Sequence, residues 1–178
     1  MGSGTSRRHG GIFNALAELH RAQGDLNAAE PLYEEALALD RERGDLASIG
    51  INLSNLAMTS ISLGLSDRAR GLVREGLAIA EEIESKRVGA VHLSCSAGLG
   101  ASLCEWKCAA WLFGATEALW AQMGFHRERA DEAFLTPVIA RTRGALGDQA
   151  FTAAESAGRS LSYEEAIAQA RAWLDEGS

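Results

Sequence analysis

Long apolar runs are missing from this sequence of 178 residues. No segment approaches the roughly 20 apolar residues that a helix needs to cross a bilayer. A secretory signal is also missing, because the first apolar stretch already carries Glu18, His20 and Arg21. Only 2 prolines interrupt long stretches rich in Ala, Leu, Glu and Arg, which lose little rotamer freedom in a helix. We therefore expect a helical protein of the cytoplasm.

Basic residues are too few to favour a nucleic-acid-binding surface. The 24 acidic residues outnumber the 17 Lys and Arg and give a net charge of -7, whereas binding phosphates requires a basic surface. The one basic cluster, Arg7–Arg8, falls in residues 1–10, which we expect to form a flexible tail. Cysteine is also scarce, and an odd count of 3 predicts reduced thiols rather than a disulfide framework.

The motifs of common enzymes are absent as well. The sequence has no Gly-rich phosphate loop that ends in Gly-Lys-Ser/Thr and no Gly-x-Ser-x-Gly nucleophile elbow. His92 and Cys95, or Cys104 and Cys108, would each put two metal ligands on one helix face. Their spacing is not that of a zinc finger or ribbon, however. We predict a protein that is not an enzyme and that holds neither metal nor cofactor.

An internal repeat with a step of 40 residues decides the expected fold. Apolar residues three or four positions apart give each helix one buried stripe, so each copy predicts two antiparallel helices. Small residues are expected where these helices approach closely, and Gly24 and Gly64 end the first helix of their copies in the left-handed conformation. The repeated positions are Phe13, Leu16, Ala17, Gly24, Ala29, Tyr33 and Ala36, then Leu53, Leu56, Ala57, Gly64, Ala69, Val73 and Gly76, then, in a degenerate third copy, Leu93, Ala97, Cys104, Ala109, Phe113 and Thr116.

The predicted fold class is all-α, an antiparallel helix-pair solenoid with C-terminal capping helices. Short connections make consecutive helices antiparallel neighbours. The helices are expected at residues 11–23, 27–42, 46–63, 67–84, 87–103 and 106–123. The expected units are a tail at 1–10, three helix pairs over 11–125 (11–45, 46–86 and 87–125), and capping helices at 126–178.

Residues 13–39, FNALAELHRAQGDLNAAEPLYEEALAL, resemble a tetratricopeptide-repeat (TPR) unit almost throughout. The Leu-Ala pair, the Gly before the turn and the Ala of the second helix match the small and large positions of that family. The usual closing proline is replaced by Arg41, and the step of 40 is similar to that of extended TPR units. The resemblance implies a superhelix whose concave groove binds a peptide or a partner helix.

The C-terminal third is expected to cap the solenoid. Ser162 and Glu165 form a capping box that predicts a helix to about Trp173, and Asp148 begins a shorter helix that carries Phe151. Pro137 predicts a bend or restart in a helix over 129–146. Three further motifs are Ala-Ala-x-Leu-x-Gly-Ala-x-Glu-Ala-Leu at 109–119, Leu-Gly-x-x-x-Phe at 146–151 and Gly-x-x-Leu-Ser-x-Glu-Glu-Ala at 158–166. With these motifs, residues 105–175 resemble the TPR-like sensor end of large bacterial ATP-binding regulators of the LuxR type.

Four aromatic residues crowd the junction between the third copy and the cap: Trp106, Trp111, Phe113 and Trp120. Aromatic side chains at helical spacing usually fill a core. We expect a core here, with an aromatic ligand pocket as the alternative.

The groove-facing positions follow from helix geometry, because the first helix of each pair lines the concave face of a TPR superhelix. Asn55 is the most informative, since an amide both donates and accepts hydrogen bonds and suits a peptide backbone. The predicted peptide- or partner-binding residues are Asn14, Glu18, Arg21, Ser54, Asn55, Met58 and Ile61, followed in the third pair by Ser94, Gly98 and Ala101.

The sequence leaves three functions open. The preferred one is a protein-interaction module that binds a peptide or a partner helix in the groove. The second is a signal- or ligand-sensing segment of an ATP-dependent bacterial transcriptional regulator, which the C-terminal resemblance implies. The third is a self-association unit, a homodimer through the N-terminal repeat, whose exposed edge has no cap of its own.

Overall fold

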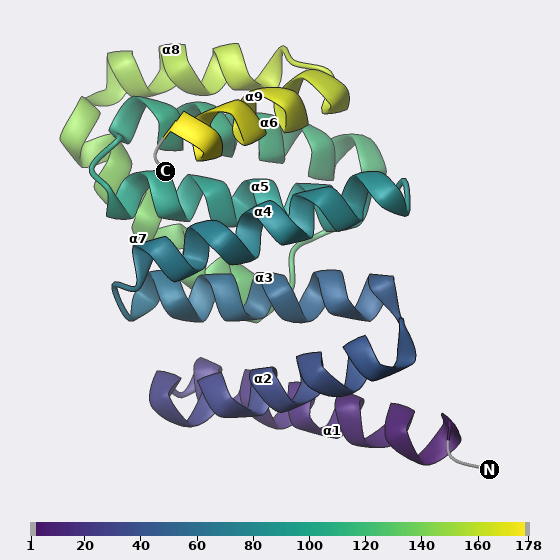
Figure 1. The fold of residues 1–178 in the computed structure, drawn as a ribbon. Helices are drawn as coiled ribbons and strands as arrows, with labels where there is room; N and C mark the ends of the chain where they lie inside the picture. The colour runs from purple at the N-terminus through teal and green to yellow at the C-terminus, as the bar shows by residue number, and fades with distance from the viewer. Residues whose placement is uncertain (1–2, 177–178) are drawn as a thin grey trace.

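The structure, a computed structural model, describes residues 3–176, with side chains from residue 10 onward. Within this range the chain consists of helices joined by short connections, and no strand occurs in it (Figure 1). The helices are α1 (Ser3–Ala22), α2 (Leu26–Arg43), α3 (Leu46–Ser62), α4 (Ser66–Glu82), α5 (Lys86–Ser102), α6 (Trp106–Met123), α7 (Arg129–Leu146), α8 (Asp148–Arg159) and α9 (Tyr163–Glu176). The predicted all-α helical-repeat fold is confirmed.

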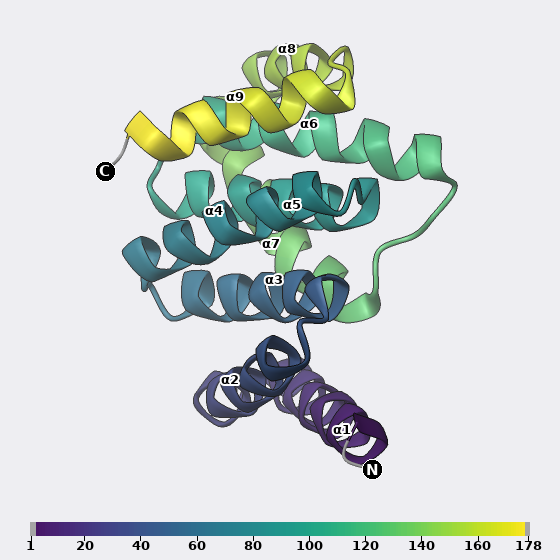
Figure 2. The same cartoon turned by 45° about the vertical axis from the view of Figure 1, so that its right-hand side comes forward.

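The first six helices form a stack of three antiparallel pairs: α1 with α2, α3 with α4, and α5 with α6. The stack rises from α1 and α2 at one end to α8 at the other, where α8 packs on α6 (Figure 1). Helix α9 crosses α4, α5 and α6 on one side of the stack, and α7 lies on the opposite side in both views (Figures 1 and 2). Helix α7 contacts α6 and α8, and it also contacts α5 and α1, which are the first helices of their pairs.

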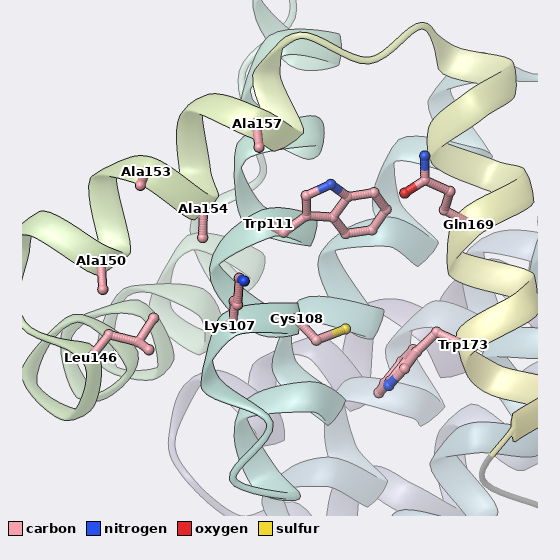
Figure 3. A pocket seen from close by; sticks show the side chains of 10 residues that line it. All are labelled: Lys107, Cys108, Trp111, Leu146, Ala150, Ala153, Ala154, Ala157, Gln169 and Trp173. Carbon is pink, nitrogen blue, oxygen red and sulfur yellow. The ribbon is translucent and has the colours of Figure 1, made fainter.

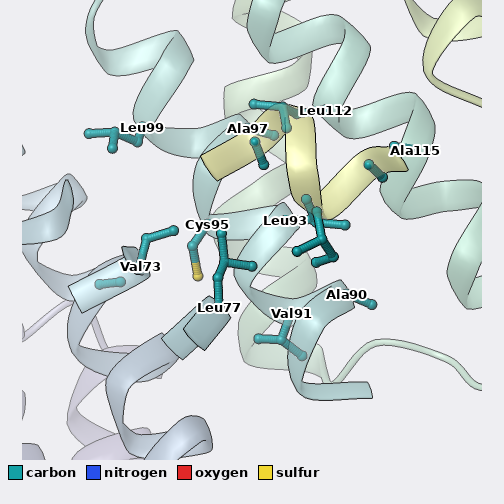
Figure 4. Close-up of a cluster of buried hydrophobic side chains, with 14 of the residues drawn as sticks. Val73, Leu77, Ala90, Val91, Leu93, Cys95, Ala97, Leu99, Leu112 and Ala115 are labelled. Carbon is teal, nitrogen blue, oxygen red and sulfur yellow. The ribbon is translucent and has the colours of Figure 1, made fainter. Parts of the chain in front are cut away.

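The small residues of the repeat lie where helices approach each other closely, as expected. All of the following are completely buried: Ala17, Ala29, Ala57, Ala69, Ala97 and Ala109. Between them, larger side chains pack in hydrophobic clusters, and Figure 4 shows part of one cluster, with Val73 and Leu77 of α4 near Leu93 and Cys95 of α5. A protein interior packs as tightly as an organic crystal, so these alanines set the distance between helices.

A left-handed turn recurs every 20 residues, twice as often as the sequence repeat indicated. Residues with positive φ stand at the ends of α1 to α6: Gly24 (80°), Gly44 (64°), Gly64 (77°), Glu84 (51°), Cys104 (61°) and Gly124 (67°). At the second turn the backbone N–H groups of Gly44 and Asp45 donate to the carbonyls of Arg41 and Asp40, each at 3.1 Å. These bonds satisfy the last carbonyls of the helix.

The residue after the left-handed position starts the next helix. Asp25, Asp45 and Ser85 each accept a hydrogen bond on their side chain from a backbone N–H three residues later, which is N-terminal capping. The same two-residue device, a left-handed residue followed by a cap, therefore recurs at three of the turns and keeps their geometry alike.

Three local expectations were wrong. Helix α1 begins at Ser3, so it includes residues 3–10, which we expected to be a flexible tail. Helix α7 continues through Pro137, so a restart there was wrong, whereas a bend at this residue stays a prediction. Leu16, expected in the buried stripe of α1, is exposed although its counterpart Leu56 is buried, because no helix of the described chain covers that face of α1.

The capping box at the start of α9 is confirmed. The backbone N–H of Ser162 donates to the Glu165 carboxylate at 2.8 Å, and the backbone N–H of Glu165 donates to the Ser162 hydroxyl at 3.2 Å. The buried stripe of this helix is Ala166, Ile167, Ala170 and Leu174. It packs against α4, α5 and α6, so α9 covers the side of the stack opposite α7.

His92, which the sequence offered as a metal ligand together with Cys95, lies inside the core of the stack. Its ring is completely buried, and Nε2 donates to the carbonyl of Gly50 at 2.9 Å. A methyl group on Gly76 of α4 would collide with this ring, so the glycine makes room for it. Burial lowers the pKa of His92 to about 4, although the bond to Gly50 opposes this, and the ring is neutral at pH 7.

We expect Cys104→Gly and Glu84→Gly each to raise the free energy of unfolding by about 1 kcal/mol, because glycine relieves the steric cost of a Cβ at positive φ. Gly64→Ala should lower it by a similar amount. Gly71→Ala is the matched control: Gly71 lies inside α4 with open space around it, so alanine should stabilise the helix there. Urea denaturation gives the free energy of unfolding of all four variants. A lower free energy of unfolding in both Cys104→Gly and Glu84→Gly would contradict the positive φ of these two residues.

Candidate functional site

Helix α7 lies in the concave groove that α1, α3 and α5 were predicted to line. Phe134 sits against Gly98 of α5, where a methyl group would lie only 2.5 Å from the ring and 3.6 Å from Ile61 of α3. At the other end of α7, the Arg141 guanidinium donates to the carbonyl of Ala101 at 3.4 Å. The absence of a side chain at Gly98 therefore forms the notch that receives Phe134.

Arg21 is the centre of a polar network that joins three helices. Its guanidinium donates to Asp131 of α7 at 2.9 Å and, on α3, to the Asn55 amide oxygen at 3.3 Å and the Met58 sulfur at 3.1 Å. The Arg21 side chain is 7% exposed and that of Asp131 is 16% exposed. A buried ion pair is costly to break from one side, because the remaining charge loses its partner in a poorly solvated place.

Asn14 and Asn55 face each other across the α1–α3 boundary. The Asn55 amide nitrogen donates to the Asn14 oxygen at 3.0 Å, and the Asn14 nitrogen donates to Glu18 at 2.9 Å. Burial raises the pKa of Glu18, and the nearby carboxylates of Glu128 and Asp131 raise it further, while the bond from Asn14 and the positive charge of Arg21 oppose them. Glu18 is therefore a carboxylate that a positive group would stabilise.

The structure places the predicted binding residues together, but not on an open surface. Ser54, Asn55, Met58 and Ile61 are buried. Ser94, Gly98 and Ala101 of the third pair are buried too. We expected these side chains to line a groove open to solvent. That expectation was wrong, because α7 covers α5 and the adjoining part of α3. Their role in binding stays a prediction.

A cleft remains open between α1 and α7. Its volume is about 700 Å³, and α1, α3 and the start of α7 form its walls. The residues that line it are Ala15, Glu18, Leu19, Arg21, Ala22, Leu26, Met58, Ser62, Glu128, Arg129, Ala130, Ala133 and Phe134. A smaller cavity of about 120 Å³ lies nearby, and Asn14, Glu18, Ser54, Asn55 and Asp131 are among the residues around it. We call the larger space the α1–α7 cleft.

Sequence reasoning missed the residues that α7 contributes, namely Glu128, Asp131 and Phe134. Residues 126–178 were expected to cap the end of the stack, and nothing in a repeat pattern shows that one capping helix returns to the groove. The acidic first turn of α7, with Asp131 and Glu132, was a possible signal, because a buried arginine such as Arg21 requires a carboxylate partner.

The aromatic residues at the third pair divide between core and surface. Trp120 is buried, and Trp106, Trp111 and Phe113 are half-buried. The Arg127 guanidinium lies 6.0 Å from the ring centres of both Phe113 and Trp120. The expected core is therefore present at Trp120, whereas Trp111 faces a separate trough between α8 and α9.

Metal ligands do not gather in the described part of the chain, where no three His, Cys, Asp or Glu side chains form a possible metal-binding group. Cys95 is buried, and its thiol lies 3.6 Å from the carbonyl of Ser54. No helix between residues 3 and 176 is both long and apolar enough to span a membrane.

Comparison with known families agrees with the repeat geometry of the first half. Residues 10–82 match the model of the family described as Tetratricopeptide repeat, and a search of curated proteins finds no match. The matched segment ends with α4, so the similarity of residues 105–175 to the sensor end of LuxR-type regulators stays a prediction. Tetratricopeptide repeats generally mediate protein–protein interaction. The first two helix pairs are tetratricopeptide-like repeats in an all-α solenoid.

Proposed function

We propose that this chain is a protein-interaction module that binds a segment of a partner protein in the α1–α7 cleft. The observation that carries the proposal is the convergence of Glu18, Arg21 and Met58 on a cleft of about 700 Å³ that α7 leaves open. Protein–protein interfaces usually combine an apolar centre with polar groups around it. Here Leu19, Leu26 and Ala133 supply the apolar surface, and Glu18 and Arg21 supply the polar groups.

Glu18 and Glu128 line the cleft together with Arg21 and Arg129, and of these four residues Glu18 favours a basic residue of the partner. Asp131 already pairs with Arg21, and Glu128 pairs with Arg87 at 3.3 Å at the rim. Glu18 accepts a hydrogen bond from the neutral amide of Asn14, and burial near the carboxylates of Glu128 and Asp131 raises its pKa although Arg21 opposes the shift. A lysine or arginine of the partner would relieve this repulsion. We therefore propose a short segment with an apolar residue on Leu19 and a basic residue on Glu18.

Helix α7 is suited to adjust to such a partner. Only Leu135 and Thr142 of this helix are buried, and Pro137 lies in its middle without a backbone N–H to donate. Elements with few buried apolar contacts open at lower free-energy cost than the core. The cleft is therefore able to widen by a small movement of α7 while the α1–α6 stack stays intact.

Peptide display on the purified chain tests the proposal. We expect the selected peptides to carry Lys or Arg beside an apolar residue. Their Kd, measured by fluorescence anisotropy, should rise about tenfold or more in Glu18→Lys, because the variant puts like charges opposite each other. Ala133→Trp should also weaken binding, because the indole fills the cleft.

Two matched controls keep this test specific. Glu35→Lys makes the same charge change at an exposed position of α2, and Ala140→Trp adds the same side chain at an exposed position of α7 outside the cleft. Both should retain the affinity of the parent chain. Equal affinity of the parent, Glu18→Lys and Ala133→Trp for the selected peptides would place binding elsewhere and refute the cleft.

A second candidate, self-association, has its own observation. Ile12, Leu16 and Leu19 are 60%, 41% and 53% exposed and lie at positions i, i+4 and i+7 of α1, so they form one apolar stripe. An identical stripe on a second copy is self-complementary about a two-fold axis. We propose this face as a weak homodimer contact. Ile12 and Leu16 belong to this face alone, whereas Leu19 also lines the cleft.

Sedimentation velocity over a wide concentration range measures this contact. The average mass of the parent chain should rise with concentration, and Ile12→Glu with Leu16→Glu should hold it at that of a monomer. Leu65→Glu, a change at another exposed leucine, should leave the association unaltered. A parent chain that stays monomeric at every concentration would remove this candidate.

A further inference from the structure

We propose that a trough at the far end of the stack, between α6, α8 and α9, binds a small aromatic carboxylate. The trough has a volume of about 800 Å³, and most of the residues that line it are apolar. The residues that line it are Lys107, Cys108, Trp111, Leu146, Ala150, Ala153, Ala154, Ala157, Gln169 and Trp173 (Figure 3). It shares no residue with the α1–α7 cleft, so the inference does not depend on the proposed function.

The shape of the trough comes from small residues on one wall and indoles on the others. On α8, four alanines line the trough: Ala150, Ala153, Ala154 and Ala157 (Figure 3). Trp111 of α6 and Trp173 of α9 line its other sides. Side chains no larger than a methyl group leave the space between the helices unfilled. The half-buried indoles provide flat surfaces, which favour an aromatic body in offset-stacked or edge-to-face contact.

Trp173 is held in place by residues outside the trough. Its indole N–H donates to Glu105 at 2.6 Å, and the Arg70 guanidinium lies 5.3 Å from the centre of the ring. Arg70 itself donates to the carbonyl of Leu174 at 2.9 Å. The position of this wall is therefore fixed before a ligand binds, which lowers the entropic cost of binding.

The charge of the trough selects an anion. Lys107 is the one charged residue that lines it, and none of the ion pairs among the described residues involves Lys107. Cys108 adds no negative charge, because burial and, to a lesser extent, the nearby Glu105 carboxylate raise the pKa of its thiol to about 12. Gln169 extends its amide toward Trp111 and offers a neutral hydrogen-bonding group (Figure 3). An aromatic carboxylate fits this lining, because its carboxylate can pair with Lys107 while its ring lies between the indoles of Trp111 and Trp173.

A volume of about 800 Å³ lies within the range of small-molecule sites, roughly 300–1,000 Å³. The trough is therefore large enough to hold a small aromatic molecule. Isothermal titration calorimetry with naphthoate, and with the isosteric but uncharged naphthamide, tests the class directly. We expect saturable binding of naphthoate at one site, with naphthamide about fivefold weaker, as an exposed ion pair allows.

Variants locate the site. Lys107→Gln should lower the affinity for naphthoate about fivefold and leave the affinity for naphthamide unchanged. Lys86→Gln, the control, should change neither affinity. Ala153→Phe, at an exposed alanine of the trough, should abolish binding of both compounds. Thr152→Phe, the neighbouring exposed position outside the trough, should preserve it. Circular dichroism confirms that each variant is folded.

Three results would overturn the proposal: no saturable binding of naphthoate, equal affinity for both compounds, or retention of binding in folded Ala153→Phe. None of these results bears on the α1–α7 cleft. Conversely, failure of peptides to bind the cleft leaves the titration with naphthoate unaffected.

Discussion

The Arg21 guanidinium holds together parts of the chain that lie far apart in sequence. It bonds Asn55 and Met58 in the second helix pair and Asp131 in α7, 110 residues away. A guanidinium carries five N–H donors in a rigid plane, so a single side chain can bond several helices at once. Because this charge is largely buried, α7 supplies the carboxylate that it needs. The groove is therefore partly closed, and the α1–α7 cleft is what remains of it.

The regular stack makes this arrangement possible. Left-handed residues at 20-residue intervals give the connections of the first six helices the same geometry, so α1, α3 and α5 share one face of the stack. The alanines fix the helix spacing on that face. Asn14 and Asn55 consequently meet within hydrogen-bonding distance. A polar pair at this boundary depends on repeat geometry rather than on any contact local in sequence.

Much of the fold could be predicted from the sequence. Ala17 and Ala57, or Gly24 and Gly64, are local signals that repeat, and each has one structural meaning. The equivalent turns at Glu84 and Cys104 were harder to find, because their residues do not favour positive φ and only the packing on either side imposes it. The repeated alanines and glycines therefore predicted the helix pairs, whereas the left-handed turns at Glu84 and Cys104 depend on tertiary packing.

The candidate site could be predicted only in part. The side chains that α1 and α3 direct to the concave face follow from helix periodicity, and they do lie together. Their burial did not follow from it, because the partner that covers them is α7. Phe134 and Gly98 fit one another in space, yet neither residue indicates the other in the sequence. A contact between a repeat and a distant helix carries no periodic signal.

The two proposed sites lie at different places in the stack and use different chemistry. The α1–α7 cleft combines Glu18 and Arg21 with apolar side chains and suits a segment of a protein. The trough at α6, α8 and α9 has one lysine among indoles and alanines and suits a small anion. One solenoid can carry both, because each helix exposes a different face at each level of the stack.

The docking of α7 in the groove is the central claim, and a double-mutant cycle on Arg21 and Asp131 tests it most directly. The free energies of unfolding of the parent, Arg21→Met, Asp131→Asn and the double variant give the coupling between the two side chains. Our account predicts a favourable coupling of about 1–3 kcal/mol, since either single change leaves a polar group buried without its partner. Additivity to within about 0.3 kcal/mol would show that α7 does not dock on α1, and it would contradict the account.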